Sequence, residues 1–202
     1  MLEADHALRG GDWNARNRLH GIELYGKTLG VIGFGKIGQR VAEMAHLAFA
    51  MPVLYYDVIN YPEAEKKLGA RRLDLEHVLK YADFVSVHTP LLPSTQGMMN
   101  EEKFKLMKKS AFFLNSSRGA VVEQPALIKA LQEGWIRGAG LDVFEPEPLP
   151  ADSPLLKMDN VVVSPHMSAH TNEALFRMAM VAEDIAAVLE GKAPKYPVVW
   201  RS

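Results

Sequence analysis

Residues 29–38 read Leu-Gly-Val-Ile-Gly-Phe-Gly-Lys-Ile-Gly, a short apolar run followed directly by a glycine-rich turn. The run predicts a strand at 29–32, and apolar side chains at helical spacing predict a helix over residues 37–48. Gly33, Gly35 and Gly38 match the G-x-G-x-x-G pattern in the strand–turn–helix setting that it requires. The first glycine allows the tight turn, the second lets the backbone approach a pyrophosphate, and the third lets helix and strand pack closely. The stretch therefore predicts a dinucleotide-binding loop.

An acidic residue follows the next predicted strand, at 53–56. Asp57 lies nineteen positions after Gly38, where a carboxylate can accept hydrogen bonds from both ribose hydroxyls of an adenosine. The same charge would repel a 2′-phosphate, and residues 58–60 contain no arginine to receive one. We therefore expect NAD rather than NADP as the cofactor. The alternative is that the glycine-rich turn and the strand-end carboxylate are purely structural.

Short apolar runs continue to alternate with segments of helical period. Further strands are predicted at 84–87, 111–114, 139–141 and 161–163. The first two of these contain no polar alternation, so we expect them to be buried on both faces. Helices are predicted at 2–8, at 101–108, from Pro125 to Gly134, and finally, as the longest helix, from an N-cap at Thr171 to Gly191. This order predicts an α/β fold with a doubly wound parallel sheet, the Rossmann architecture.

The composition excludes several classes of protein. The 202 residues are 48% hydrophobic and 23% charged, contain no cysteine and carry a net charge of −1, which is typical of a globular chain. Disulfide scaffolds, Cys-ligated zinc and catalytic thiols are excluded, and the near-zero charge offers no bulk attraction to nucleic acid or an anionic membrane. No apolar segment approaches the ~20 residues of a membrane span, and the N-terminus has no signal-peptide pattern. We expect a cytoplasmic protein with no nucleic-acid or membrane partner.

Polar side chains follow the predicted strands at the point where each strand ends. Because the carboxyl ends of parallel strands meet at one edge of a sheet, side chains far apart in sequence can converge there. Besides Asp57, this edge receives His88-Thr89-Pro90, Asn115-Ser116-Ser117-Arg118, Asp142 with Glu147 five positions later, and Ser164-Pro165-His166.

An arginine, a glutamate and a histidine at one edge suit the oxidation of a hydroxyl group beside a carboxylate. The planar guanidinium of Arg118 can bind a carboxylate through two hydrogen bonds. His166 can take the hydroxyl proton as hydride leaves the carbon, and can return it in the reverse reaction. A carboxylate such as that of Glu147, on the other ring nitrogen, would fix the tautomer of the imidazole and favour its protonated form.

Each of these residues also has an alternative interpretation. Arg118 can cap a turn, Glu147 can be a solvated charge, and His166 can be an ordinary loop histidine. His88 is an alternative base at a strand end. His166 and His170 are spaced like a metal pair, but no nearby Asp or Glu completes a ligand set, so no metal site is predicted.

Five motifs together resemble the NAD-dependent D-isomer-specific 2-hydroxyacid dehydrogenases, which include D-3-phosphoglycerate, D-lactate and glyoxylate/hydroxypyruvate enzymes. The resemblance extends from about residue 26 to residue 199. It rests on Gly33 to Gly38 with Asp57; on His88-Thr89-Pro90-Leu91 with Thr95 and Asn100; on Asn115-Ser116-Ser117-Arg118-Gly119; on Gly140-Leu141-Asp142-Val143-Phe144 leading to Glu147-Pro148; and on Ser164-Pro165-His166.

The resemblance implies a role for each motif. Arg118 would bind the carboxylate of a 2-hydroxy or 2-oxo acid, His166 would be the acid/base, and Glu147 would pair with His166. Asp142 and the backbone around Ser116 would hold the nicotinamide carboxamide. The full set implied to contact NAD is Gly33, Gly35, Lys36, Ile37, Gly38, Asp57, Thr89, Pro90, Thr95, Ser116, Ser117, Arg118, Asp142, His166 and Ser168.

One residue separates the sequence from a similar branch, and one loop departs from the usual pattern of the family. Glu147 separates it from the similar formate dehydrogenases, which have Gln at this position. Met167-Ser168-Ala169 stands where the family often has Ile-Gly-Gly, so side chains there are expected to reshape the loop near the nicotinamide.

The resemblance also implies a flavodoxin-like substrate domain, built mostly from chain that precedes the dinucleotide unit, and we expect that domain to be largely absent from these 202 residues. We interpret residues 1–25 as the remnant of an interdomain helix and linker, and residues 26–170 as the NAD-binding Rossmann domain. Residues 171–202 would be a helix and tail returning toward the missing domain. The exposed aromatic expected at Trp13, with no local core to bury it, favours a homodimer.

These features predict an oxidoreductase that transfers hydride between NAD and a 2-hydroxy acid/2-oxo acid pair. In this length it is expected to bind NADH but to turn over 2-oxo acids poorly. Two alternatives are an NADH-sensitive, corepressor-like module that binds a protein partner, and a truncated fragment with no activity of its own.

Overall fold

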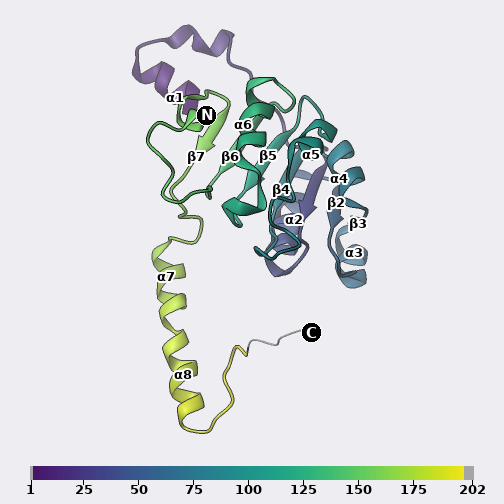
Figure 1. Cartoon of the computed structure of the whole chain (residues 1–202), viewed down its shortest axis with the longest axis vertical. Coiled ribbons are helices and arrows are strands. Elements are labelled where there is room, and N and C mark those ends of the chain that lie inside the picture. The colour runs from purple at the N-terminus through teal and green to yellow at the C-terminus, as the bar shows by residue number, and fades with distance from the viewer. Residues whose placement is uncertain (1, 198–202) are drawn as a thin grey trace. The chain divides into compact units, whose positions relative to one another are not determined.

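The computed structural model describes residues 2–197, and the chain divides into two compact units, 1–166 and 167–202. The first unit contains one seven-stranded sheet in the order β3-β2-β1-β4-β5-β6-β7 (Figure 1). All neighbouring strands in it are parallel. The strand order extends outward in both directions from the β1/β4 pair, which is the topology of a doubly wound sheet. The predicted Rossmann architecture is therefore confirmed, whereas the predicted domain bounds stay a prediction.

The strands correspond closely to the apolar runs of the sequence. They are β1 (Leu29–Ile32), β2 (Val53–Tyr56), β3 (Arg71–Arg72), β4 (Phe84–Val87), β5 (Phe112–Asn115), β6 (Gly138–Leu141) and β7 (Val161–Val163). Strands β5 and β6 begin one residue away from their predicted starts. Strand β3 was not predicted, because its two arginines carry no apolar signal and pair only with β2 at the edge of the sheet.

The helices described in the first unit are α1 (Leu2–Arg9), η1 (Trp13–Asn17), α2 (Lys36–Phe49), α3 (Pro62–Leu68), α4 (Leu75–Tyr81), α5 (Glu101–Leu106), η2 (Gly119–Val121), α6 (Gln124–Gln132) and η3 (Pro154–Lys157). Three of these helices, η1, α4 and α5, begin at a capping side chain. The side chain of Asp74 accepts the His77 N–H at the start of α4, and that of Asn100 accepts the Lys103 N–H at the start of α5. Helices α3 and α4 lie between predicted strands and were not predicted.

Two apolar clusters fill the two faces of the sheet. Leu79 of α4, Phe104 of α5 and Leu127 of α6 belong to one cluster, and α4, α5 and α6 lie in a row along that face (Figure 1). Ala42 of α2 and Leu68 of α3 belong to the other cluster. Side chains of the strands alternate between these clusters, as the pleat of a strand requires.

The second face is covered over only part of its width. Helix α2 packs beside β1 and against α3, whereas on the same face Leu114 of β5 is 36% exposed and Val162 of β7 is 53% exposed. The prediction that residues 111–114 are buried on both faces is therefore wrong for Leu114. Leu114 is exposed because α2 and α3 lie over other strands, so this face of β5 has no helix of the first unit on it.

The second unit contains the helices α7 (Asn172–Ala179) and α8 (Val181–Leu189). Thr171 caps α7 as predicted, since its side chain accepts the Ala174 N–H at 3.1 Å. The single long helix predicted here is wrong, because Met180 has a ψ of −8° and interrupts it; among the described helices α2, with 14 residues, is the longest. None of the described residues of α7 and α8 is buried. The last part of the predicted tail, residues 198–202, lies outside the described residues.

None of the helices described between residues 2 and 197 has the length and apolar character needed to cross a membrane.

Because helices cover the two faces of the sheet unequally, the same Leu→Ala substitution is expected to lower the free energy of unfolding by different amounts on the two faces. Leu127, 2% exposed on α6, lies in the larger cluster, so Leu127→Ala is expected to lower the free energy of unfolding by about 2–5 kcal/mol. Leu114→Ala, on the open face, is expected to cost less than about 1 kcal/mol. Urea denaturation of both variants measures the difference. An equal loss of unfolding free energy in the two variants would contradict the conclusion that this face is open at Leu114.

Candidate active site

The turn after β1 brings the backbone of two neighbouring strands into close approach. Gly33 has a φ of +88°, and a Cβ placed on it would lie 2.7 Å from the carbonyl carbon of His88, at the end of β4. A Cβ on Gly38 would collide with the carbonyl oxygen of Gly33. Gly35, in contrast, caps α2 and faces open space where a side chain would stand. The loop thus packs tightly on the protein side and leaves the start of α2 accessible to a ligand.

Asp57 lies at the end of β2 beside this loop. Its Oδ2 accepts the N–H of Phe34 at 2.6 Å, and its Oδ1 accepts the N–H of Ile59 at 2.9 Å. Its backbone carbonyl accepts a hydrogen bond from Nη2 of Arg72 at 2.9 Å, and the carbonyl of Val58 accepts another at 3.2 Å. Arg72 belongs to β3, so the sequence, which did not predict this strand, did not indicate it as a neighbour of Asp57.

The residues after β4 offer a buried polar group to the same crevice. Within the part of the chain that the structure describes, Oγ1 of Thr89 is buried and has no hydrogen-bond partner. Thr95 closes the following loop, because its hydroxyl donates to the carbonyl of Pro90 at 2.6 Å and accepts the N–H of Leu92 at 2.8 Å. A buried hydroxyl without a partner costs free energy, and a bound dinucleotide would supply that partner. The residues present therefore fit NAD.

The loop after β5 is held by a residue for which the sequence predicted no role. Asn115 is 2% exposed, and its Oδ1 accepts hydrogen bonds from the N–H of Ser117 at 3.0 Å and from its hydroxyl at 2.8 Å. Its Nδ2 donates to the carbonyl of Arg118 at 3.0 Å. The guanidinium of Arg118 is exposed and uses Nη1 to donate to the carbonyl of Ser117 at 2.7 Å, which leaves further N–H donors of the planar group for a ligand.

The ends of β6 and β7 are joined at Asp142. Its Oδ1 accepts the hydroxyl of Ser164 at 2.6 Å, and its backbone carbonyl accepts the N–H of His166 at 2.8 Å. Asp142 is buried, 5% exposed. A buried carboxylate at this point fixes the segment from Ser164 to His166 against its neighbouring strand.

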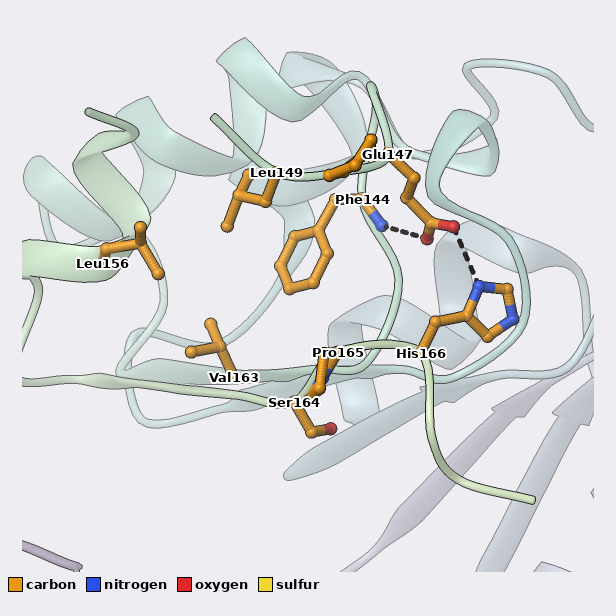
Figure 2. Close-up of a pocket in the computed structure, with 9 residues that line it drawn as sticks. Phe144, Glu147, Leu149, Leu156, Val163, Ser164, Pro165 and His166 are labelled. Atoms are coloured by element: carbon orange, nitrogen blue, oxygen red, sulfur yellow. Dashed lines mark hydrogen bonds and ion pairs between the residues drawn. The ribbon is translucent and has the colours of Figure 1, made fainter. Parts of the chain in front are cut away.

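His166 and Glu147 form a hydrogen-bonded pair (Figure 2). Nδ1 of His166 lies 2.8 Å from Oε2 of Glu147, and Oε1 of Glu147 accepts the N–H of Phe144 at 3.0 Å. The bond to His166, with the bond from Phe144, holds the pKa of the Glu147 carboxyl below its ordinary value. An ionised carboxylate can only accept, so Nδ1 carries a proton in this pair. The other ring nitrogen lies on the side of the imidazole away from Glu147 (Figure 2).

A close backbone contact joins the arginine loop to this pair. A Cβ on Gly119 would collide with the carbonyl oxygen of Phe144, so the chain after Arg118 passes directly against the residue that donates to Glu147. The charge of Arg118 also contributes to lowering the pKa of the Glu147 carboxyl. Arg118, Glu147 and His166 are therefore brought together, as the sequence predicted they would be. His166 has a φ of +50°, a left-handed conformation uncommon outside glycine.

An apolar cavity of about 620 Å³ lies beside the pair (Figure 2). Figure 2 shows the ring of Phe144 and the side chains of Leu149, Leu156 and Val163 around it, with the His166–Glu147 pair at one end. The histidine therefore lies at the border of an apolar cavity, with the carboxylate of Glu147 beside it.

The remaining predicted residues lie at different places. Lys36 and Ile37 are at the start of α2, next to the glycine loop. Ser168 and His170 belong to the second unit, whereas the other predicted site residues belong to the first. His88 is half-buried, with Nε2 at 2.9 Å from the hydroxyl of Ser86, and burial lowers its pKa. Among the described residues, no group of three or more His, Cys, Asp or Glu is placed to hold a metal ion.

Known proteins are similar to this chain in sequence and in fold. The family model for the D-isomer specific 2-hydroxyacid dehydrogenase, NAD binding domain, matches residues 1–168. A glyoxylate reductase of Korarchaeum cryptofilum is 48% identical over 96% of this chain and 59% of its own length.

Solved structures agree with these sequence matches. A crystal structure of a protein from Thermus thermophilus has a TM-score of 0.89 and 45% identity, over 98% of this chain and 62% of that one. The NAD-complexed form of a D-isomer specific 2-hydroxyacid dehydrogenase from Lactobacillus delbrueckii ssp. bulgaricus has a TM-score of 0.80 and 40% identity, over 88% of this chain and 58% of that one. This chain thus spans about 60% of the length of the relatives it matches.

Two glycines of the loop are expected to respond differently to alanine. Gly38→Ala places a Cβ against the carbonyl of Gly33, so it should lower the free energy of unfolding by about 1–3 kcal/mol. Gly35→Ala enters open space and should change stability by less than about 0.5 kcal/mol, while weakening NADH binding because the methyl group occupies the phosphate approach. Thermal unfolding and NADH fluorescence titration measure the two effects. Unchanged NADH affinity in Gly35→Ala would count against the phosphate site.

The hydrogen-bonded pair of His166 and Glu147 predicts the direction in which the stability of the fold changes with pH. The lowered pKa of Glu147 means that its stabilising contribution is present above the ordinary pKa of 4.5 and is lost as pH falls through the lower folded value. A carboxyl-detected NMR titration should show its inflection below 4.5, and His166→Gln should raise it. An inflection that His166→Gln leaves in place would contradict the pairing.

Proposed function

The chain belongs to the D-isomer-specific 2-hydroxyacid dehydrogenase family, whose NAD-binding domain it carries, and we propose that it interconverts a 2-hydroxy acid and a 2-oxo acid with NAD. The observation that carries the proposal is the His166–Glu147 pair, at the same sheet edge as Arg118 and the glycine loop. The chain spans only 59% of the length of the glyoxylate reductase that it resembles. The activity of such a reductase is therefore a proposal for this chain.

The proposed cofactor site uses the turn after β1 and the ends of β2 and β4. Gly33 and Gly35 would let the backbone approach the pyrophosphate, and Asp57 would accept hydrogen bonds from the adenosine ribose. The buried hydroxyl of Thr89 would gain the partner that it lacks among the described residues. NAD, when bound, supplies the group that accepts or donates the hydride.

Arg118 would hold the substrate. Its guanidinium is exposed, and Nη1 donates to the carbonyl of Ser117. The remaining donors can bind a carboxylate through two parallel hydrogen bonds, which fixes the orientation of the adjacent carbon. Asn115 supports this role because its amide holds the carbonyl of Arg118.

His166 would transfer the proton. Because Nδ1 is engaged by Glu147, Nε2 is the ring nitrogen that can face the substrate oxygen. In the reducing direction, protonated His166 gives this proton to the carbonyl oxygen as the carbon receives hydride. In the oxidising direction, neutral Nε2 takes the proton from the hydroxyl group. Glu147 stabilises the charged imidazole and keeps its orientation.

Small 2-oxo acids such as glyoxylate and hydroxypyruvate are the proposed substrates. The glyoxylate reductase of Korarchaeum cryptofilum and a glyoxylate/hydroxypyruvate reductase B of Escherichia fergusonii are 48% and 44% identical to this chain.

We also propose a homodimer in the cytoplasm, as the sequence predicts. Trp13 is 67% exposed, which supports a subunit contact there, and sedimentation of wild type and Trp13→Ala would test it.

Removal of the proposed acid/base is expected to abolish turnover while sparing cofactor binding. His166→Ala should lower glyoxylate-dependent NADH oxidation by about 10²- to 10⁴-fold, with NADH affinity changed much less. The control, His20→Ala, removes an exposed histidine before β1 and should leave the rate unchanged.

The same assay separates the alternatives. Equal rates for wild type and His166→Ala would contradict the proposed mechanism. NADH binding by wild type without consumption of any 2-oxo acid would overturn the proposed activity and favour a binding module. A folded chain that fails to bind NADH would favour an inactive fragment.

A further inference from the structure

Tyr55 is a fully buried tyrosine in β2 whose hydroxyl contacts the chain that follows Asp57. The hydroxyl lies 2.7 Å from Oε1 of Glu65 and 3.0 Å from Oδ1 of Asn60, and it accepts the N–H of Tyr61 at 3.2 Å. Burial raises the pKa of Tyr55, so the group keeps its proton and donates it to one of the two oxygens. One hydroxyl therefore fixes both the end of the loop after β2 and the start of α3.

The ring of Tyr55 also contacts the glycine loop. It stacks on Phe34 with a centroid distance of 4.0 Å and an interplanar angle of 16°. Tyr61 meets Phe34 edge-on at 5.9 Å and Tyr55 at 6.4 Å. Phe34 stands between Gly33 and Gly35, and its N–H donates to Oδ2 of Asp57 at 2.6 Å. The tyrosine thus contacts both segments that would meet the adenosine half of NAD.

We propose that Tyr55 is a positioning residue that holds Asp57 for the adenosine ribose and thereby sets the preference for NAD over NADP. The inference rests on the proposed role of Asp57. A carboxylate recognises two adjacent hydroxyls only when both its oxygens are correctly placed. Residues 57–61 hold Asp57 at one end, through the Ile59 N–H, and are bound to Tyr55 at the other.

The loop has a second attachment that the hydroxyl does not share. Arg72 holds the carbonyls of Asp57 and Val58 from β3. Removal of the Tyr55 hydroxyl therefore loosens residues 59–61 without releasing the start of the loop. The carboxylate keeps its charge and its place in sequence but loses part of its alignment.

The two nucleotides should respond differently to this loosening. NADH would use both ribose hydroxyls and thus depends on the alignment of Asp57. NADPH carries a 2′-phosphate that the carboxylate repels, so it gains little from the same alignment. A general loss of packing, in contrast, would weaken both nucleotides equally.

The test uses the whole chain and does not require turnover. In Tyr55→Phe, which keeps the stacked ring, the Kd of NADH by fluorescence titration should rise about five- to tenfold, as expected when the misaligned Asp57 carboxylate loses one hydrogen bond to the ribose. The Kd of NADPH should change less than about twofold, so the preference for NADH falls. Tyr81→Phe, which removes a hydroxyl from a 55% exposed ring on α4, is the matched control and should change neither constant.

A second pair of variants tests the same hydrogen bond from outside the core. Glu65→Ala removes the acceptor on α3 but leaves Oδ1 of Asn60 and the bond from the Tyr61 N–H in place. It should therefore cause the same selective loss of NADH affinity as Tyr55→Phe, but a smaller one. Glu65→Gln keeps an acceptor oxygen and should lose less. Agreement between Tyr55→Phe and Glu65→Ala would support the positioning role even where one variant folds poorly.

Asp57→Asn separates failure of the inference from failure of its premise. If Asp57→Asn leaves NADH affinity unchanged, the proposed role of Asp57 is wrong and the inference falls with it. If Asp57→Asn weakens NADH but Tyr55→Phe does not, Tyr55 is only a structural residue and the inference alone is overturned. An equal rise in the Kd of NADH and NADPH in Tyr55→Phe would overturn it as well.

Discussion

The parallel direction of all seven strands is the constraint on which the site depends. Because every strand ends at the same edge, the residues that follow the strands, from Gly33 after β1 to His166 after β7, reach one crevice although they lie far apart along the chain. The hydrogen bonds of Asp142 show the effect locally, since they join the ends of β6 and β7. An antiparallel pair anywhere in this sheet would move one of these groups to the opposite edge.

Close backbone contacts then set the distances between the loops. Gly33 lies against His88, and Gly119 lies against Phe144, at places where a Cβ would have to displace backbone atoms. The second contact connects Arg118 to the Glu147–His166 pair through the N–H of Phe144. Substrate binding and proton transfer would therefore share one rigid support, while Asn115 orients the arginine loop through its hydrogen bond to the carbonyl of Arg118.

Much of this was predictable because its signals are local. Apolar runs predicted six of the strands, the strand–turn–helix setting predicted the glycine loop, and strand-end positions predicted that Arg118, Glu147 and His166 would meet. Arg72 and Tyr55 act through contacts between segments that no local pattern connects. Asn115 acts locally, on residues two and three positions after it, but the sequence assigned it no role. The exposure of Leu114 was missed because periodicity predicts an apolar face without stating what covers it. The break at Met180 was missed because the apolar period continues across it.

We propose that one sheet edge holds NAD at the glycine loop and the substrate carboxylate at Arg118, beside His166. Backbone amide NMR of the whole chain tests this arrangement, first with NADH and then with the unreactive 2-oxo acid analogue oxamate. NADH is expected to shift the signals of residues 33–38, Asp57 and Thr89, and oxamate is expected to shift those of Arg118 and His166. Shifts confined to the opposite edge, around Asp83 and Asn160, would contradict it.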